Sequence, residues 1–171
     1  EGGNRLVAVS CLKDPSVENP TLDDVYRTGT IIAIRMMAQV PDGLRLIVQG
    51  IQRVEILEAV QTSPYLRVKV RPIEEPSVSE SETLEIEAQR RKLGDLFKRV
   101  VNLSADLPDE MASLPDNVTE PSPMTDLIAA QMPRLTFAER QEVLEQPTIK
   151  ARMSRLLTLM SREVQIGRAH V

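Results

Sequence analysis

The hydrophobic period of this chain changes once, at a short polar segment near its middle. Residues Tyr65–Arg71 alternate apolar and polar side chains, which is typical of a strand with one face on a core. Residues Leu93–Val100 instead repeat their apolar side chains at helical spacing. The segment between them, IEEPSVSESE at Ile73–Glu82, is polar and contains proline. The sequence therefore predicts an α+β fold, with a β-rich subdomain over residues 1–76 and a helical bundle over 77–165.

At least four antiparallel strands are predicted within residues 5–72, enough for a small closed or nearly closed barrel. Pro41-Asp42-Gly43 predicts a turn, because proline presets φ and glycine accepts a positive φ. Gly50 is expected to break or bulge the strand before Ile51–Val60. The alternation in Leu44–Gln49 and Tyr65–Arg71 predicts two core-facing sets of side chains: Leu44, Leu46 and Val48, and Leu66, Val68 and Val70.

The helical half carries several start signals. Ser79 with Glu82 and Thr136 with Glu139 each fit a capping box. Further helices are expected to begin with Pro108 in a first turn, with Ser122-Pro123 as an N-cap and first residue, and with Thr148 as an N-cap. The last helix has a long apolar stripe: Ile149, Met153, Leu156, Leu157, Met160 and Val164.

The charge balance disfavours nucleic acid as the main partner. The formal net charge is −4, with −1 over residues 1–76 and −3 over the remainder. Six basic residues could form a stripe on the sheet, which as an alternative predicts an anion or RNA surface. Since only two tyrosines accompany them in the β half, a solvated charged face is favoured. The six are Arg35, Arg45, Arg53, Arg67, Lys69 and Arg71.

Cysteine usage and hydropathy indicate the cellular compartment in which the chain folds. Cys11 is the only cysteine, so an intramolecular disulfide is excluded and a reducing compartment, most simply the cytoplasm, is expected. We interpret Cys11 as a small core residue of a buried strand. No run of apolar residues is long enough for a transmembrane helix, and no signal peptide is recognisable.

No motif for catalysis, cofactor binding or metal binding was found. None of the seven glycines belongs to a phosphate-binding loop, and the serines occur in turns and caps. The pairs Asp23-Asp24 and Glu74-Glu75 lack further spaced oxygen ligands, which favours solvated carboxylates over a calcium site. Met36 and Met37 point to opposite faces of a strand, so at most one lies in a core. The exposed one is a candidate substrate-binding residue, against the simpler interpretation of a surface methionine or core filler.

Several stretches, taken together and in order, resemble the N-terminal domain of the ATP-dependent Lon protease family. In the β half these are RLVAVSCLKDP, DDVYRTGT, the Pro-Asp-Gly turn followed by GIQR, and YLRVKVRPIEEP. In the helical half they are ADLPDEMASL, TDLIAAQMP and FAERQEVLEQPTIKARMSRLLTLMSRE. The resemblance covers roughly residues 5–165.

The resemblance implies a PUA-like β-barrel followed by a helical bundle. It implies a role in recognising unfolded or damaged proteins and in assembling a hexamer, for protein quality control. ATP and magnesium would belong to an ATPase module, and peptide cleavage to a serine protease module, neither of which these residues contain. The chain also lacks the first strand and helix that usually open the family's domain, which would leave an open sheet edge.

Two other functions remain as alternatives, and the C-terminal six residues are interpreted separately. The chain could be a stand-alone Lon-like adaptor or ligand-binding protein, or an RNA-binding PUA-like module, although fold alone is weak evidence for function. Residues 166–171, IGRAHV, correspond to the translation of a common sequencing adapter, so we interpret them as a non-native tail. His170, the only histidine, is therefore assigned no role.

Overall fold

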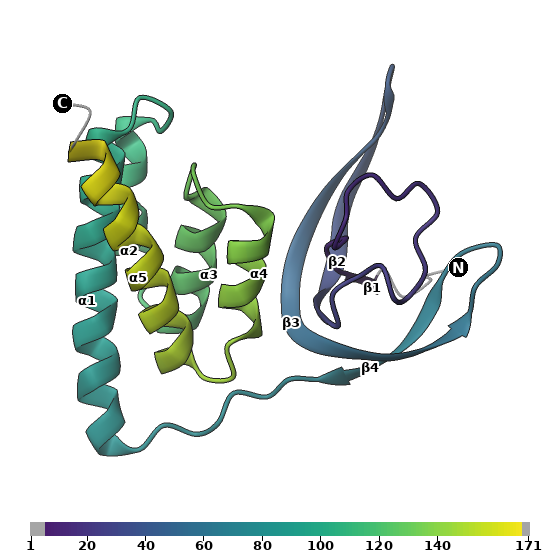
Figure 1. The fold of residues 1–171 in the computed structure, drawn as a ribbon, viewed down its shortest axis with the longest axis horizontal. Helices are drawn as coiled ribbons and strands as arrows, with labels where there is room; N and C mark the ends of the chain where they lie inside the picture. Colours follow the sequence, from purple (N-terminus) through teal and green to yellow (C-terminus); the bar gives the residue numbers. More distant parts are fainter. Residues whose placement is uncertain (1–5, 169–171) are drawn as a thin grey trace. The chain divides into compact units, whose positions relative to one another are not determined.

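The computed structural model describes residues 6–168, without the side chains of 166–168. The chain divides into two compact units, residues 1–74 and 75–171 (Figure 1). His170 lies outside the described residues. The first unit is a sheet and the second is helical, so the predicted α+β class is confirmed.

The sheet contains four antiparallel strands in the order β1-β2-β3-β4. They are β1 (Leu6–Val9), β2 (Thr28–Val40), β3 (Gly43–Gln61) and β4 (Arg67–Pro72). Each strand pairs with the next one along the chain, and within residues 6–168 no pairing joins β1 to β4. The described strands therefore form an open meander, and their pairings do not close a barrel.

Two glycines in this unit occupy positions that a side chain would not accept. Gly43 follows the Pro41-Asp42 turn with a φ of 134°, which confirms the predicted turn. A Cβ on Gly29 would lie 2.4 Å from the carbonyl oxygen of Val9, so β1 and β2 approach closely there. The expected irregularity near Gly50 is present as a register shift, in which Ile51 is left between two paired residues of β3.

The core-facing residues predicted in Leu44–Gln49 are not buried. Leu44, Leu46 and Val48 are all exposed, whereas the buried apolar residues of this unit are Ala33, Val54 and Ile56. The prediction was wrong because alternation shows which side chains share a face, and only a covering layer would make that face a core. For Tyr65–Arg71 the prediction was partly right: Val68 and Val70 of β4 are half-buried, but Leu66, just before β4, is exposed.

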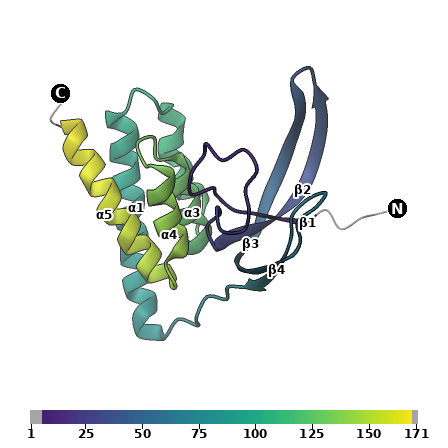
Figure 2. The same cartoon turned by 45° about the vertical axis from the view of Figure 1, so that its right-hand side comes forward.

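The second unit is a helical bundle with its own core. Its elements are α1 (Glu80–Leu103), the 3₁₀ helix η1 (Asp109–Ser113), α2 (Leu114–Asn117), α3 (Pro121–Gln131), α4 (Phe137–Glu145) and α5 (Ile149–Arg168). Helices α1 and α5 run side by side (Figures 1 and 2). The core includes Phe97 and Leu93 of α1, Ile128 of α3 and the predicted stripe of α5.

Both predicted capping boxes are present, at Ser79 with Glu82 and at Thr136 with Glu139. Thr148 also accepts a hydrogen bond from the backbone N–H of Ala151, as expected of an N-cap. The Ser122 prediction was wrong, because α3 begins at Pro121 and its N-cap is Glu120. Pro108 precedes a 3₁₀ helix and lies at its N-cap instead of inside a first turn.

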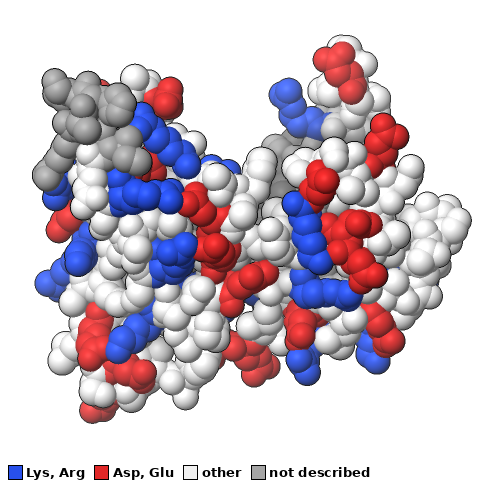
Figure 3. Space-filling model, viewed as in Figure 1, with Lys and Arg blue, Asp and Glu red and all other residues white. Residues whose placement is uncertain are grey.

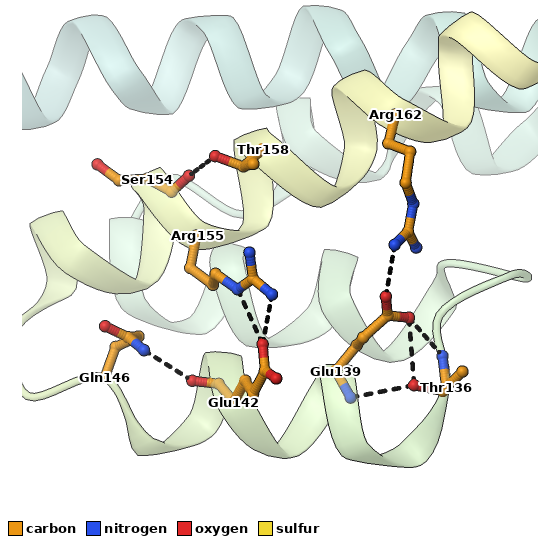
Figure 4. Close-up of polar contacts among 8 residues, drawn as sticks. All are labelled: Thr136, Glu139, Glu142, Gln146, Ser154, Arg155, Thr158 and Arg162. Atoms are coloured by element: carbon orange, nitrogen blue, oxygen red, sulfur yellow. Dashed lines mark hydrogen bonds and ion pairs between the residues drawn. The ribbon is translucent and has the colours of Figure 1, made fainter.

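Two ion pairs join α4 to α5 (Figure 4). Arg162 donates to Glu139 at 2.7 Å, and Arg155 donates to Glu142 at 3.0 Å. Glu139 also accepts hydrogen bonds from the backbone N–H and hydroxyl of Thr136. The hydrogen bond from Arg162, followed by that from the Thr136 backbone, lowers the pKa of the Glu139 carboxyl from 4.5 to about 2.

Acidification is expected to weaken the bundle through Glu139. Because its pKa is lower in the folded state, its contribution is present above about pH 4.5 and is lost as the pH falls toward about 2. We expect the urea midpoint of the helical circular-dichroism signal to drop between about pH 6 and about pH 3. Glu139→Gln should flatten this drop, and an unchanged pH profile in that variant would contradict the assignment.

Candidate functional site

The β2–β3 hairpin extends beyond the neighbouring strands as a two-stranded arm. Pairing of β1 with β2 ends at Ala33, and pairing of β4 with β3 begins at Val54. We call residues 34–52 between these limits the arm; Figures 1 and 2 show it projecting from the rest of the sheet. Only Ile34 and Val40 in the arm are half-buried, and all its other residues are exposed.

Apolar side chains occupy both faces of the arm. Met36 pairs with Ile47, and Met37 pairs with Leu46, so the two methionines lie on opposite faces as predicted. Met36 is 57% exposed and Met37 is 59% exposed, so neither is a core residue. Other exposed apolar residues of the arm are Leu44, Val48 and Ile51. Contiguous exposed apolar surface of this kind marks interaction sites in soluble proteins.

The arm carries little charge. Its three charged residues are Arg35, Asp42 and Arg45. Arg35 donates from Nε and Nη2 to Oε1 of Gln49 across the hairpin, at 2.8 and 2.6 Å. The surface of the arm is therefore mainly apolar, with one guanidinium held over the opposite strand.

The basic residues of the sheet do not form a continuous stripe. Lys69 pairs with Glu58 at 3.3 Å, and Arg71 donates from Nε to Glu55 at 3.1 Å, while Arg53 is buried. Figure 3 shows blue and red residues interleaved over the visible face of the β unit. Five of the six basic residues are exposed, as the predicted solvated face requires, but for the buried Arg53 the prediction was wrong.

The remaining sequence candidates lie apart from the arm. Cys11 is exposed and follows β1, so its interpretation as a core residue was wrong. Asp23 pairs with Arg27, and Asp24 accepts hydrogen bonds from Thr21. Within residues 6–168 no cluster of three or more histidine, cysteine or carboxylate side chains could hold a metal ion. No helix among those residues is both long and apolar enough to span a membrane.

A buried arginine in α5 was missed by the sequence analysis. The Arg152 guanidinium donates from Nη1 to both carboxylate oxygens of Asp126, at 3.0 and 3.2 Å. Its Nη2 donates to Ser122 at 2.6 Å and to Glu75, so Glu75 is not merely solvated. Arg152 lies three residues after Ile149 and so on the apolar face of α5. A charged residue at that helical spacing was the sequence signal for a buried ion pair. Glu75 lies in the segment that leads into α1, which we call the entry segment. The cluster therefore holds the entry segment against α3 and α5.

The chain combines a sheet that carries the arm with a helical bundle that follows it. The exposed apolar side chains of the arm are typical of a binding module. The family model described as "ATP-dependent protease La (LON) substrate-binding domain" matches residues 1–162. The chain belongs to this family.

Several known proteins are similar to the chain. It is 38% identical over 165 residues to a Lon protease of Dictyoglomus thermophilum, and 33% identical over 163 residues to one of Anaeromyxobacter dehalogenans. These matches cover 96% and 95% of the chain but only 20% and 19% of the relatives, so it spans about a fifth of their length.

Two solved structures share the fold. The N-terminal domain of a Mycobacterium avium complex Lon protease superimposes with a TM-score of 0.67 at 19% sequence identity. A Lon N-terminal domain protein from Xanthomonas campestris gives a TM-score of 0.50 at 14% identity. Each match covers 91% of this chain and 89% of the other.

Proposed function

We propose that this chain recognises unfolded or damaged polypeptides for an ATP-dependent Lon-type protease, and that the arm is the contact surface. The observation that carries the proposal is the exposure of apolar side chains on both faces of the arm. Unfolded segments expose apolar residues that folded proteins bury, so a surface that selects them needs accessible apolar area. The family's description as a substrate-binding domain supports this assignment.

The wider assembly belongs to the same proposal. ATP hydrolysis with magnesium and peptide cleavage would occur in other modules of the full-length protein, and the domain would contribute to a homo-hexamer in the cytoplasm. The similarity to Lon proteases, of which this chain matches about a fifth, supports these expectations. The rival hypothesis, a stand-alone adaptor, predicts that no ATPase reading frame follows in the genomic DNA.

The double variant Met36→Ser/Met37→Ser tests the contact surface. Removing one exposed thioether from each face should weaken binding to a permanently unfolded protein, such as a reduced and carboxymethylated one, by about tenfold. Because both side chains are more than half exposed, the unfolding free energy should change by less than about 0.5 kcal/mol. Fluorescence anisotropy and urea denaturation would measure the two quantities.

A matched control removes exposed apolar side chains outside the arm. Val78→Ser/Leu84→Ser takes away two such side chains from residues near the start of α1. The control should bind the unfolded protein like the unmodified chain. Equal affinity of the arm variant and the unmodified chain would show that the methionines are not the contact.

A further inference from the structure

One edge of the arm presents an unpaired main chain. Strand β3 is paired with β2 along Gly43–Gly50, whereas its pairing with β4 begins only at Val54. The backbone N–H of Ile73 also donates to the carbonyl oxygen of Arg53, and on this edge no described residue pairs with β3 between Gly43 and Gln52. Pro72 and Pro76 favour departure of the chain from the sheet, because proline cannot donate a ladder hydrogen bond. Within residues 6–168, the outer edge of Leu44–Gly50 is therefore open.

This edge has few of the features that natural proteins use to block strand addition. Exposed edges are usually short, bulged, or supplied with lysine, proline or inward charges. Leu44–Gly50 contains no proline and one charge, Arg45, and each of its residues pairs with a residue of β2. Its own residues carry no bulge: one lies next to it at Ile51 of β3, and the other at Arg35 of β2, opposite Val48 and Ile47. The result is seven consecutive β3 residues without a bulge of their own, long enough to accept an added strand.

We propose that an extended segment of an unfolded polypeptide binds by adding a strand to the Leu44–Gly50 edge of β3. The proposal rests on the proposed function and specifies its binding mode. Main-chain N–H and C=O groups along the edge would pair with those of the segment, and every polypeptide has these groups. Met36 with Ile47 on one face, and Met37 with Leu46 on the other, would then contact alternate side chains of the segment.

The chemistry of the edge selects an extended polypeptide as the occupant. Unpaired main-chain donors and acceptors at strand spacing are complementary to another main chain in β conformation, and folded proteins seldom offer one. Arg45 gives Leu44–Gly50 a net charge of +1, which favours a segment carrying carboxylates and disfavours a second copy of the same edge. Recognition through the main chain also tolerates many sequences, as binding of diverse unfolded proteins requires.

The test compares two peptides with the same side chains on the full 171-residue chain. One is a capped peptide of about ten residues that alternates valine and glutamate; the other carries N-methyl groups on all its internal amides. N-methylation removes the main-chain donors but adds apolar area, so side-chain docking alone would keep or increase the affinity. We expect the methylated peptide to bind at least about tenfold more weakly by fluorescence anisotropy.

Amide hydrogen exchange locates the added strand. Binding of the unmethylated peptide should slow exchange at alternate residues within Leu44–Gly50, because only every second N–H faces the open edge. Equal affinity of the two peptides, or protection confined to Met36–Val40, would overturn strand addition at this edge while leaving the proposed function intact. Protection that grows with protein concentration alone, together with a doubled mass in sedimentation, would assign the edge to a second copy and overturn the proposal. Failure of both peptides and of unfolded proteins to bind would instead refute the proposed function.

Discussion

Phe97→Ala is expected to lower the unfolding free energy of the helical unit by about 3–5 kcal/mol. Phe97 is fully buried, and it lies in the cluster formed by α1, α3, α4 and α5. Truncation removes the transfer free energy of a phenyl ring and leaves a cavity that the surrounding helices fill only partly. Urea denaturation followed by the helical circular-dichroism signal measures the loss, because every α-helix among residues 6–168 belongs to this unit.

The other phenylalanine of the chain provides a matched control. Phe137 opens α4, is 67% exposed, and contacts the Arg140 guanidinium at 5.9 Å from the ring centroid. Phe137→Ala should cost less than about 1 kcal/mol, since it removes only a surface cation–π contact. Equal losses in the two variants would contradict the placement of Phe97 in the core.

Arg152→Ala is expected to lower the unfolding free energy by about 3 kcal/mol. The Arg152 side chain is 1% exposed, so its replacement leaves a cavity and removes the cation shared by Glu75 and Asp126. The expected loss is at the lower end for buried ion pairs, because the two carboxylates are 32% and 44% exposed and can regain water. The same urea titration measures it.

Arg155 supplies the control on the same helix. It pairs with Glu142 at the surface, where the two side chains are 35% and 51% exposed. Arg155→Ala should therefore cost less than about 1 kcal/mol. If Arg152→Ala cost no more than Arg155→Ala, the buried cluster would contribute no more than a surface pair, and its role in holding the entry segment would be refuted.

Local signals in the sequence predicted the elements of the fold well. The capping boxes at Ser79 and Thr136, the turn before Gly43 and the apolar stripe of α5 all depend on residues close together in the chain. Their hydrogen bonds and periodicities are local, so neighbouring residues suffice to specify them. The sequence stretches that resemble the Lon N-terminal domain, taken in their order along the chain, also predicted the family correctly.

The candidate site was predicted only in part. Exposure of at least one of Met36 and Met37 followed from alternation, but exposure of Leu44, Leu46 and Val48 did not. Those residues alternate like a core-facing strand, and only the absence of a covering layer among the described residues makes them surface. The Arg152 cluster was likewise missed, because Asp126 and Glu75 are brought together by packing and not by sequence spacing.

By itself, the sequence determined that strands precede helices, where the turn at Gly43 and the two capping boxes lie, and which family the chain belongs to. Only the tertiary structure decided which apolar faces are covered, which strand edge is unpaired and which carboxylates share a guanidinium. The physical reason is that periodicity and capping arise within one element, whereas burial and edge pairing depend on residues far apart in the chain.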